Sequence, residues 1–150
     1  MAVMSERPYR NSNFLVDFGR GDSNSLLAGF AEVIFPDFIV DQPEGHQRPH
    51  MVHQPVEQAE VAAANRLVLK RGVIGSLDLY AWWDEARNGK APRQRTVKVE
   101  LLGEDQSTVV LTWRFDNVRP VSLSYSPLRA MEGGILMETL ILEFDKVEML

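Results

Sequence analysis

The sequence contains no cysteine, which excludes disulfide bonds, thiolate metal ligands and thiol nucleophiles together. Histidine is scarce as well, and the three that occur lie close together at His46, His50 and His53. No Gly-x-Ser-x-Gly motif is present, and the glycines never form a phosphate-binding loop between a strand and a helix. These absences remove the common hydrolase and nucleotide-binding sites. We therefore expect a protein that is not an enzyme, with no catalytic residue, no metal and no cofactor.

Long apolar runs are also lacking. No segment approaches the roughly 20 apolar residues that a helix needs to cross a bilayer. Residues 1–10 carry Glu6, Arg7 and Arg10 where a secretory signal has an apolar core. We expect no membrane segment, and we expect synthesis and assembly in the cytoplasm.

Positive charge is outnumbered by negative charge. The chain has 16 Lys and Arg against 21 Asp and Glu, which gives a formal net charge of −5. An acidic surface repels the phosphate backbone, so specific nucleic-acid binding is not expected. A length of 150 residues with 45% hydrophobic residues suits one globular domain over residues 1–150.

Alternation of apolar and polar residues predicts that most of the chain forms strands. Early strands are expected over residues 13–19, 28–35 and 66–71, and a last one over residues 135–145. Between them, two further strands are expected around a hairpin loop at residues 103–107. Residues 117–120 should then turn or bulge the chain, and a strand is expected over residues 121–125, with Val121, Leu123 and Tyr125 on one face. The side chains expected on the apolar faces of the later strands are Val97, Val99, Leu101, Val109, Leu111, Trp113, Phe115, Leu140, Leu142 and Phe144.

One helix is expected, over about residues 77–88. Its apolar face consists of side chains at i, i+3, i+4 and i+7, namely Leu79, Trp82, Trp83 and Ala86. Ser76 is the candidate N-cap, and Gly89 occupies the position that follows the C-cap. The sequence thus predicts a mainly β fold, an antiparallel sandwich or barrel with one flanking helix.

Residues 41–65 differ from the rest. Pro43, Pro49 and Pro55 recur there, so the segment should be a long proline-rich arm or loop rather than a helix or central strand. The three histidines share this segment at i, i+4 and i+7, a spacing that would gather them on one helical face as metal ligands. Because the prolines oppose that helix, we favour a solvated loop over a zinc or nickel site. A metal-dependent enzyme built on these histidines is the third interpretation of function.

Trp82 and Trp83 suggest a second interpretation. Exposed tryptophans form stacking platforms for sugars, so a monomeric β-sandwich module that binds carbohydrate remains an alternative. At least one of the two lies on the apolar face of the expected helix, where core packing is the commoner use.

The order of motifs resembles the tail-tube protein family of contractile phages, which includes the inner-tube proteins of extracellular contractile injection systems. The resemblance covers nearly the whole chain. It rests on Leu-Val-Leu-Lys-Arg-Gly at 67–72, Leu-Asp-Leu-Tyr-Ala-Trp-Trp at 77–83, Trp-Arg-Phe-Asp-Asn at 113–117 and Met-Glu-Thr-Leu-Ile-Leu-Glu-Phe at 137–144. Residues 41–65 depart from the family pattern, because many members carry glycines and a Leu-Pro-Gly-like turn there.

The resemblance implies a β-barrel-like fold whose copies form rings, six to a ring, stacked into a hollow tube. The implied partners are copies of the chain itself, sheath and baseplate proteins, and cargo that passes through the lumen. The implied location is a virion tail or a released extracellular particle. Because of the departure at 41–65, an alternative is that the chain forms a specialised ring that joins the tube to the baseplate.

Residues expected at the contacts between subunits come from the arm and from nearby basic positions. The basic ones would pair with acidic groups of a neighbouring subunit, since the chain is acidic overall. The candidates are Asp41, Gln42, Glu44, His46, His50, His53, Lys70, Arg71, Arg93 and Arg95. Candidate lumen or exterior positions are Thr96, Lys98, Thr112, Ser122 and Ser124.

Overall fold

The computed structural model describes residues 1–19, 29–40, 65–89 and 95–150. Within these ranges the chain forms the strands β1 (Phe14–Asp17), β2 (Glu32–Ile34), β3 (Arg66–Gly72), β4 (Arg95–Leu102), β5 (Val109–Tyr125), β6 (Met137–Glu143) and β7 (Lys146–Met149). The helix α2 (Asp78–Arg87) lies between β3 and β4 in the sequence. The predicted class, a mainly antiparallel β fold with one flanking helix, is confirmed for the described residues.

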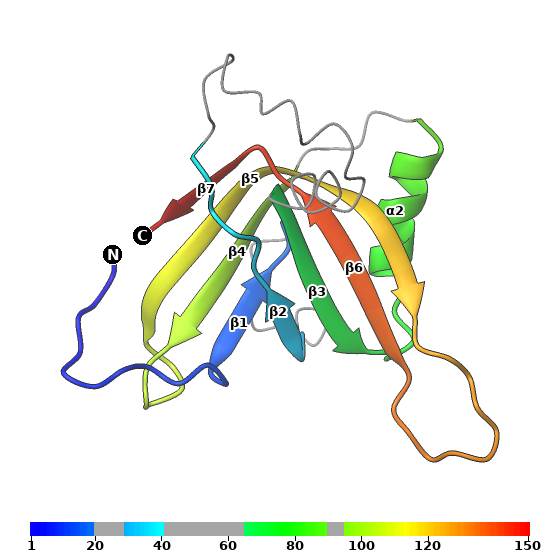
Figure 1. The fold of residues 1–150 in the computed structure, drawn as a ribbon, viewed down its shortest axis with the longest axis horizontal. Coiled ribbons are helices and arrows are strands. Elements are labelled where there is room, and N and C mark those ends of the chain that lie inside the picture. Colours follow the sequence, from blue (N-terminus) through cyan, green and yellow to red (C-terminus); the bar gives the residue numbers. More distant parts are fainter. Residues whose placement is uncertain (20–28, 41–64, 90–94) are drawn as a thin grey trace, which may run out of the picture.

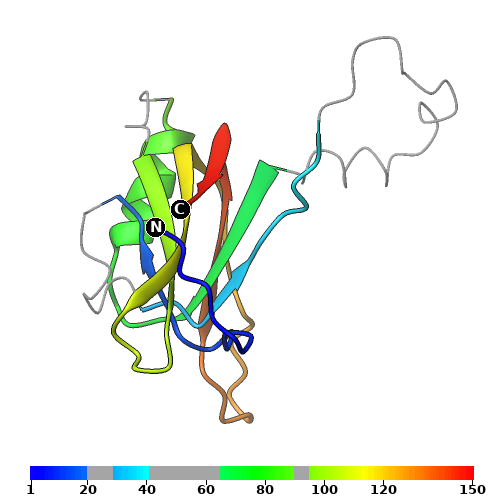
Figure 2. The same cartoon turned by 90° about the vertical axis from the view of Figure 1, so that its left-hand side faces the viewer.

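The strands follow one hydrogen-bonded path in the order β1-β4-β5-β6-β3-β2, and β7 pairs with β5. The path folds into two layers that share β5 (Figure 1). We call the layer of β1, β4, the N-terminal part of β5 and β7 sheet A, and the layer of the C-terminal part of β5, β6, β3 and β2 sheet B. Figure 2 shows the two layers side by side, splayed apart at one end, with α2 on the side of sheet A.

β5 passes from one sheet to the other without a break. It pairs with β4 as far as Val118 and with β6 from Arg119 onward. Asn117 lies between these two parts with a φ of +55°, a left-handed conformation that asparagine tolerates better than most residues. Pro120 lies where the register shifts, and a bulge suits a residue without a backbone N–H. Of the predicted turn or bulge at 117–120, the structure shows a bulge, and residues 121–125 continue the same strand instead of forming a separate one. Val121 and Tyr125, expected with Leu123 on an apolar face, are exposed, because the bulge changes the alternation.

The core fills the space between the two sheets. It includes Val16 and Val99 from sheet A, Leu67 and Leu140 from sheet B, and Trp82 from α2. Strand alternation explains the pattern, since inward positions on β3 and β6 are buried while their neighbours are half-exposed. The predicted apolar faces of β6 and of the middle of β5 are confirmed.

Alternation fails at one point, the hairpin between β4 and β5. The register shifts between Leu101 and Leu102, so that Leu102 is buried and Leu101 is half-buried. On the facing strand, Val110 is buried and Val109 is exposed, the reverse of the predicted order. A shift by one residue exchanges the two faces of a strand, and the sequence pattern gave no sign of it.

Several predicted boundaries need correction. The expected strand at 28–35 is only Glu32–Ile34, and the expected last strand at 135–145 ends at Glu143 and is followed by the separate β7. Leu77, not Ser76, is the N-cap position of α2, but the Ser76 hydroxyl still accepts a hydrogen bond from the Asp78 N–H at 3.3 Å. Gly89 follows the C-cap with a φ of +68°, as predicted. The predicted arm at 41–65 lies, except for residue 65, outside the described residues.

Candidate functional site

The candidate interface residues fall into two groups. Seven lie outside the described residues, and these are Asp41, Gln42, Glu44, His46, His50, His53 and Arg93. Lys70 and Arg71 are neighbours on β3, and Arg95 is the first residue of β4. Adjacent residues of a strand point to opposite faces, so Lys70 and Arg71 have different surroundings.

Lys70 lies on the outer face of sheet B. Its Nζ is 3.9 Å from Glu32 Oε1 on β2, the strand that forms the edge of the sheet. Both side chains are partly exposed, so this ion pair contributes at most about 1 kcal/mol to folding. The Lys70 side chain thus remains partly exposed on this face.

Arg71 lies in the interior, with 1% of its surface exposed. Its Nε donates to Glu138 Oε1 on β6 at 2.5 Å, and one terminal nitrogen donates to Asp78 Oδ1 in the first turn of α2, also at 2.5 Å. The guanidinium also lies 5.5 Å from the ring centroid of Phe30. The structure therefore gives Arg71 a role inside its own subunit: it joins α2 to two strands of sheet B.

Arg71 and Asp78 hold each other in the ionised state. Burial alone would raise the pKa of Asp78, but hydrogen bonds from Arg71 and Ser76 outweigh it and lower that pKa below the ordinary 3.8. Burial likewise acts to lower the pKa of Arg71, and the hydrogen bonds to Asp78 and Glu138 raise it instead. The pKa of Tyr125 is raised, first by burial and then by the charge of Glu138.

The lowered pKa of Asp78 predicts a pH dependence of stability. A carboxyl whose pKa is lower in the folded state stabilises the fold at pH values above its unfolded pKa, here about 3.8. That stabilisation is lost as the pH falls through the folded pKa. We expect the free energy of unfolding, measured by urea denaturation, to fall below about pH 4, and to fall less steeply in Asp78→Asn. Asp84→Asn, which alters a carboxyl at the outer surface of the same helix, should keep the wild-type slope; equal slopes in all three proteins would contradict the assignment.

Arg95 does not join the other basic residues. Its guanidinium carbon lies 4.3 Å from the centroid of Trp82, and a Cβ on Gly19 would lie 2.9 Å from its Cδ. Lys70 is on the outer face of sheet B, Arg71 is interior, and Arg95 covers a core tryptophan. The described members of the expected basic cluster therefore do not form one surface.

The tryptophans of α2 offer a poor platform for sugars. Trp82 is 1% exposed and belongs to the core. Trp83 is partly exposed, but the Arg87 guanidinium lies 4.8 Å from its centroid and Tyr80 packs at 6.1 Å. Among the residues that the structure describes, no three His, Asp or Glu side chains are placed to hold a metal ion. None of the described helices is long and apolar enough to span a membrane.

Sequence reasoning missed Asp78 and Glu138 as partners of Arg71, although the pattern held a signal. Arg71 shares the inward face of β3 with Leu67 and Leu69, and Glu138 shares that of β6 with Leu140 and Leu142. Charges of opposite sign at inward positions of two strands point to a buried ion pair once the strands are known to be neighbours.

Sheet B has an open face and two open edges. No described helix covers its outer face, since α2 lies on the side of sheet A (Figure 2). At one edge β2 pairs only with β3, and at the other the C-terminal part of β5 pairs only with β6, within the described ranges. Charged residues on the outer face form ion pairs with one another, namely Arg66 with Glu143, Arg119 with Glu143 and Asp145, and Lys70 with Glu32.

The candidate lumen positions divide between the two sheets. Ser122 and Ser124 pair with Ile141 and Thr139, which lie on the outer face of sheet B. Thr96, Lys98 and Thr112 belong to the strands of sheet A. These residues therefore cannot all line one surface of the subunit.

The comparisons with known proteins agree with one another. The family described as T4-like virus tail tube protein gp19 matches residues 10–148. The fold is similar to that of a chain in an extracellular contractile injection system, the PVC sheath–tube complex in its extended state, with a TM-score of 0.70, 19% identity, and coverage of 97% of this chain and 93% of that one. A chain of the anti-feeding prophage cap, described as a tube-terminating cap, gives a TM-score of 0.72 and 18% identity, and covers 100% and 95%. Hcp1 from Flavobacterium johnsoniae gives 0.52 and 14%, and covers 91% and 93%. No curated protein sequence matches the chain.

Proposed function

The chain belongs to the T4-like virus tail tube protein gp19 family and is a structural subunit of a tube, and we propose that its copies close into a ring through the two open edges of sheet B. Six copies to a ring is the number that the family resemblance implies. Rings would then stack into a hollow conduit, and the role of the chain would be assembly, not catalysis.

The observation that carries this proposal is that, among the described residues, no strand pairs with the outer edge of β2 or of the C-terminal part of β5. An unpaired strand edge presents a row of backbone N–H and C=O groups that another strand can complete. β2 of one copy beside the C-terminal part of β5 of the next would continue the sheet from subunit to subunit, as in strand addition. A contact between two different edges is heterologous, and it closes into a ring when the rotation between copies fits.

The outer face of sheet B is then the natural inner wall of the tube. Its charged side chains are paired with one another, and Ser122, Ser124 and Thr139 add small polar side chains. A wall without unpaired charge binds passing cargo weakly, which suits a conduit. Sheath and baseplate proteins are proposed to contact other surfaces of the ring, and Lys70 remains a candidate contact near the edge. The family places the assembled particle in a phage tail or an extracellular injection particle.

Proline at the open edge tests ring closure. The Lys70 carbonyl points toward β2, because it accepts a hydrogen bond from the Ala31 N–H. Glu32 and Ile34 lie opposite Lys70 and Val68, so their N–H groups point toward β3 and the N–H of Val33 between them points away. Val33→Pro therefore removes an outward N–H and leaves the bonds between β2 and β3 intact. We expect the wild type to form rings or tubes in negative-stain microscopy across a concentration series, and Val33→Pro to stay a folded monomer.

Val33→Ala is the matched control, because it shortens the same side chain and keeps the N–H. It should assemble like the wild type. Rings of Val33→Pro at wild-type concentrations would overturn the role of the β2 edge. A wild type that stays monomeric at every concentration would overturn ring closure itself.

A further inference from the structure

We propose that the tip of the β5–β6 hairpin docks onto residues 38–40 of a second copy of the chain in the adjacent ring. This rests on the proposed function and deepens it, because it names the surfaces that stack one ring on the next.

The direction of stacking follows from the strands of sheet B. If β2 and β5 pair around the ring, the hydrogen bonds of the sheet run around its circumference. The strands then run broadly along the tube axis, tilted as in other closed barrels. The two ends of these strands therefore face the neighbouring rings.

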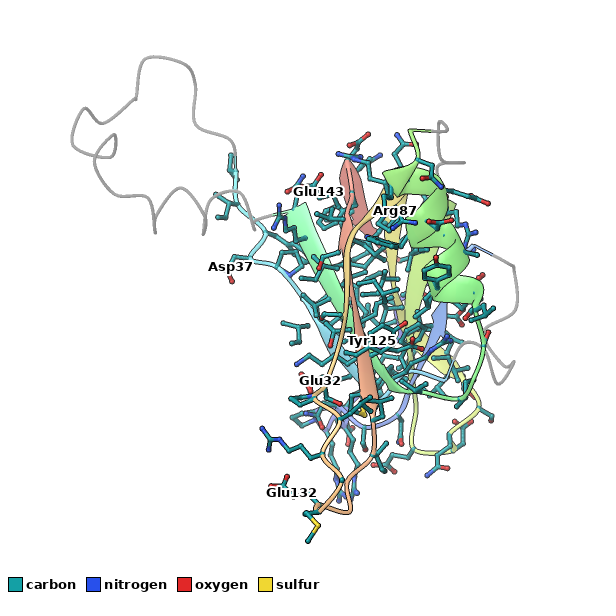
Figure 3. All side chains as sticks on the ribbon, turned by 90° about the vertical axis from the view of Figure 1, so that its right-hand side faces the viewer. Glu32, Asp37, Arg87, Tyr125, Glu132 and Glu143 are labelled. Atoms are coloured by element: carbon teal, nitrogen blue, oxygen red, sulfur yellow. The ribbon has the colours of Figure 1, made fainter. Side chains whose placement is uncertain are left out.

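The β5–β6 hairpin lies at one end of the strands of sheet B. β3 pairs at that end through Gly72 with Met137, and β5 through Tyr125 with Glu138. The hairpin extends beyond the body of the protein (Figure 1), and Figure 3 shows Glu132 at its tip. Its base is pinned, because the Ser126 N–H donates to the Met137 carbonyl and the Met137 N–H to the Ser126 hydroxyl, both at 2.9 Å. The tip is thus presented in a fixed direction.

Apolar side chains gather on this end. Leu128 is 85% exposed and Met131 97% exposed, and Ile135 is also largely exposed. The loop after β3 lies beside the hairpin, since the Val73 N–H donates to the Leu136 carbonyl at 2.9 Å, and it adds the exposed Ile74. The only charges in the described hairpin loop, Arg129 and Glu132, pair with each other at 3.2 Å. An apolar, neutral surface of this kind is typical of an interaction site.

The opposite strand end carries a second apolar surface. β2 runs from Glu32, opposite Lys70, to Ile34, opposite Val68, so the chain leaves β2 toward the start of β3 and away from the hairpin. Phe38, Ile39 and Val40 follow, each more than half exposed. Figure 3 shows Asp37 near this segment and Glu132 at the far end of the molecule.

The two surfaces fit the requirement of a stack. A head-to-tail assembly needs two different surfaces at opposite ends of the subunit, each complementary to the other. Both are apolar here, and each is left uncovered within the described subunit. We therefore assign the hairpin tip of one copy to residues 38–40 of a copy in the next ring.

The test replaces Leu128 and Met131 together by glutamate, in the full-length chain, and follows assembly by negative-stain microscopy and sedimentation. Both side chains are nearly fully exposed, so the variant should fold. We expect L128E/M131E to close into rings that remain single at concentrations at least about tenfold above those at which the wild type stacks. Glu132→Gln in the same loop is the control and should stack normally.

A second variant examines the other surface. F38S/I39S should also give single rings, and a mixture of preformed rings of the two variants should give pairs of rings and nothing longer, because each variant keeps one intact surface. Tubes of L128E/M131E like those of the wild type would overturn the docking proposal while ring closure stands. Loss of ring closure in L128E/M131E would also overturn it, by assigning the hairpin to the contacts within a ring. Absence of rings in the wild type would instead be the failure of the proposed function.

Discussion

Arg71→Ala is expected to lower the free energy of unfolding by about 3–5 kcal/mol, the usual cost of removing one partner from a buried ion pair. The variant would leave Asp78 and Glu138 without their shared cation in the interior of the protein. It would also remove the two ion pairs through which Arg71 joins α2 to β6 of sheet B. Urea denaturation measures the change, at a protein concentration too low for assembly to add stability.

Arg66→Ala is the matched control. Arg66 lies on the same strand and pairs with Glu143 at 3.4 Å, but both side chains are partly exposed, so its loss should cost no more than about 1 kcal/mol. Replacing all three buried charges by apolar residues, Arg71→Met with Asp78→Leu and Glu138→Leu, should recover most of the stability lost in Arg71→Ala. Equal costs for Arg71→Ala and Arg66→Ala would show that the buried cluster does not join the helix to the sheet.

Strands could be predicted from the sequence where apolar and polar residues alternate without interruption. β3 and β6 show this, because both have one buried and one outer face and their inward residues alternate without interruption. The helix could be predicted because Leu79 and Trp82 mark one face at helical spacing, and both are buried.

Prediction failed where the outcome depends on a neighbouring strand. A turn or a bulge was predicted at 117–120, but alternation cannot decide between them, because whether such a bend ends a strand depends on the partner beyond it. The same holds for the shift at Leu102, which is fixed by the pairing with Val109. Register is a property of two strands, and a sequence displays only one at a time.

The candidate site also has one part that the sequence could predict and one part that depends on neighbouring strands. Lys70 could be placed on an outer face from its position alone, but the interior role of Arg71 requires knowing that β3 and β6 are neighbours and that α2 begins beside them. The two surfaces proposed for stacking could not be predicted from the sequence for a related reason. Leu128 and Phe38 look like ordinary apolar residues in the sequence, and only the structure shows that they are exposed at opposite ends of the subunit.

Trp82→Ala is the second substitution with a large expected effect. Trp82 lies in the core with 1% of its surface exposed, under the guanidinium of Arg95. Removing a buried tryptophan side chain leaves a cavity that the surrounding structure fills only in part, at a cost of about 3–5 kcal/mol. The free energy of unfolding should fall by that amount, measured at the same low protein concentration. Leu77→Ala, on an exposed side chain next to the helix, should change it by no more than about 0.5 kcal/mol.

Trp82→Phe separates the two contributions of the indole. The Trp82 Nε1–H is buried and meets no acceptor among the described residues, so the ring contributes apolar contact but carries an unsatisfied donor. A buried donor without a partner costs about 1–3 kcal/mol, and phenylalanine removes it while keeping most of the apolar volume. We therefore expect Trp82→Phe to cost less than about 1.5 kcal/mol, since the relieved donor offsets part of the lost volume. A cost as large as that of Trp82→Ala would mean that the indole N–H has an acceptor in the folded protein, and that α2 is fixed to the core by a hydrogen bond as well as by packing.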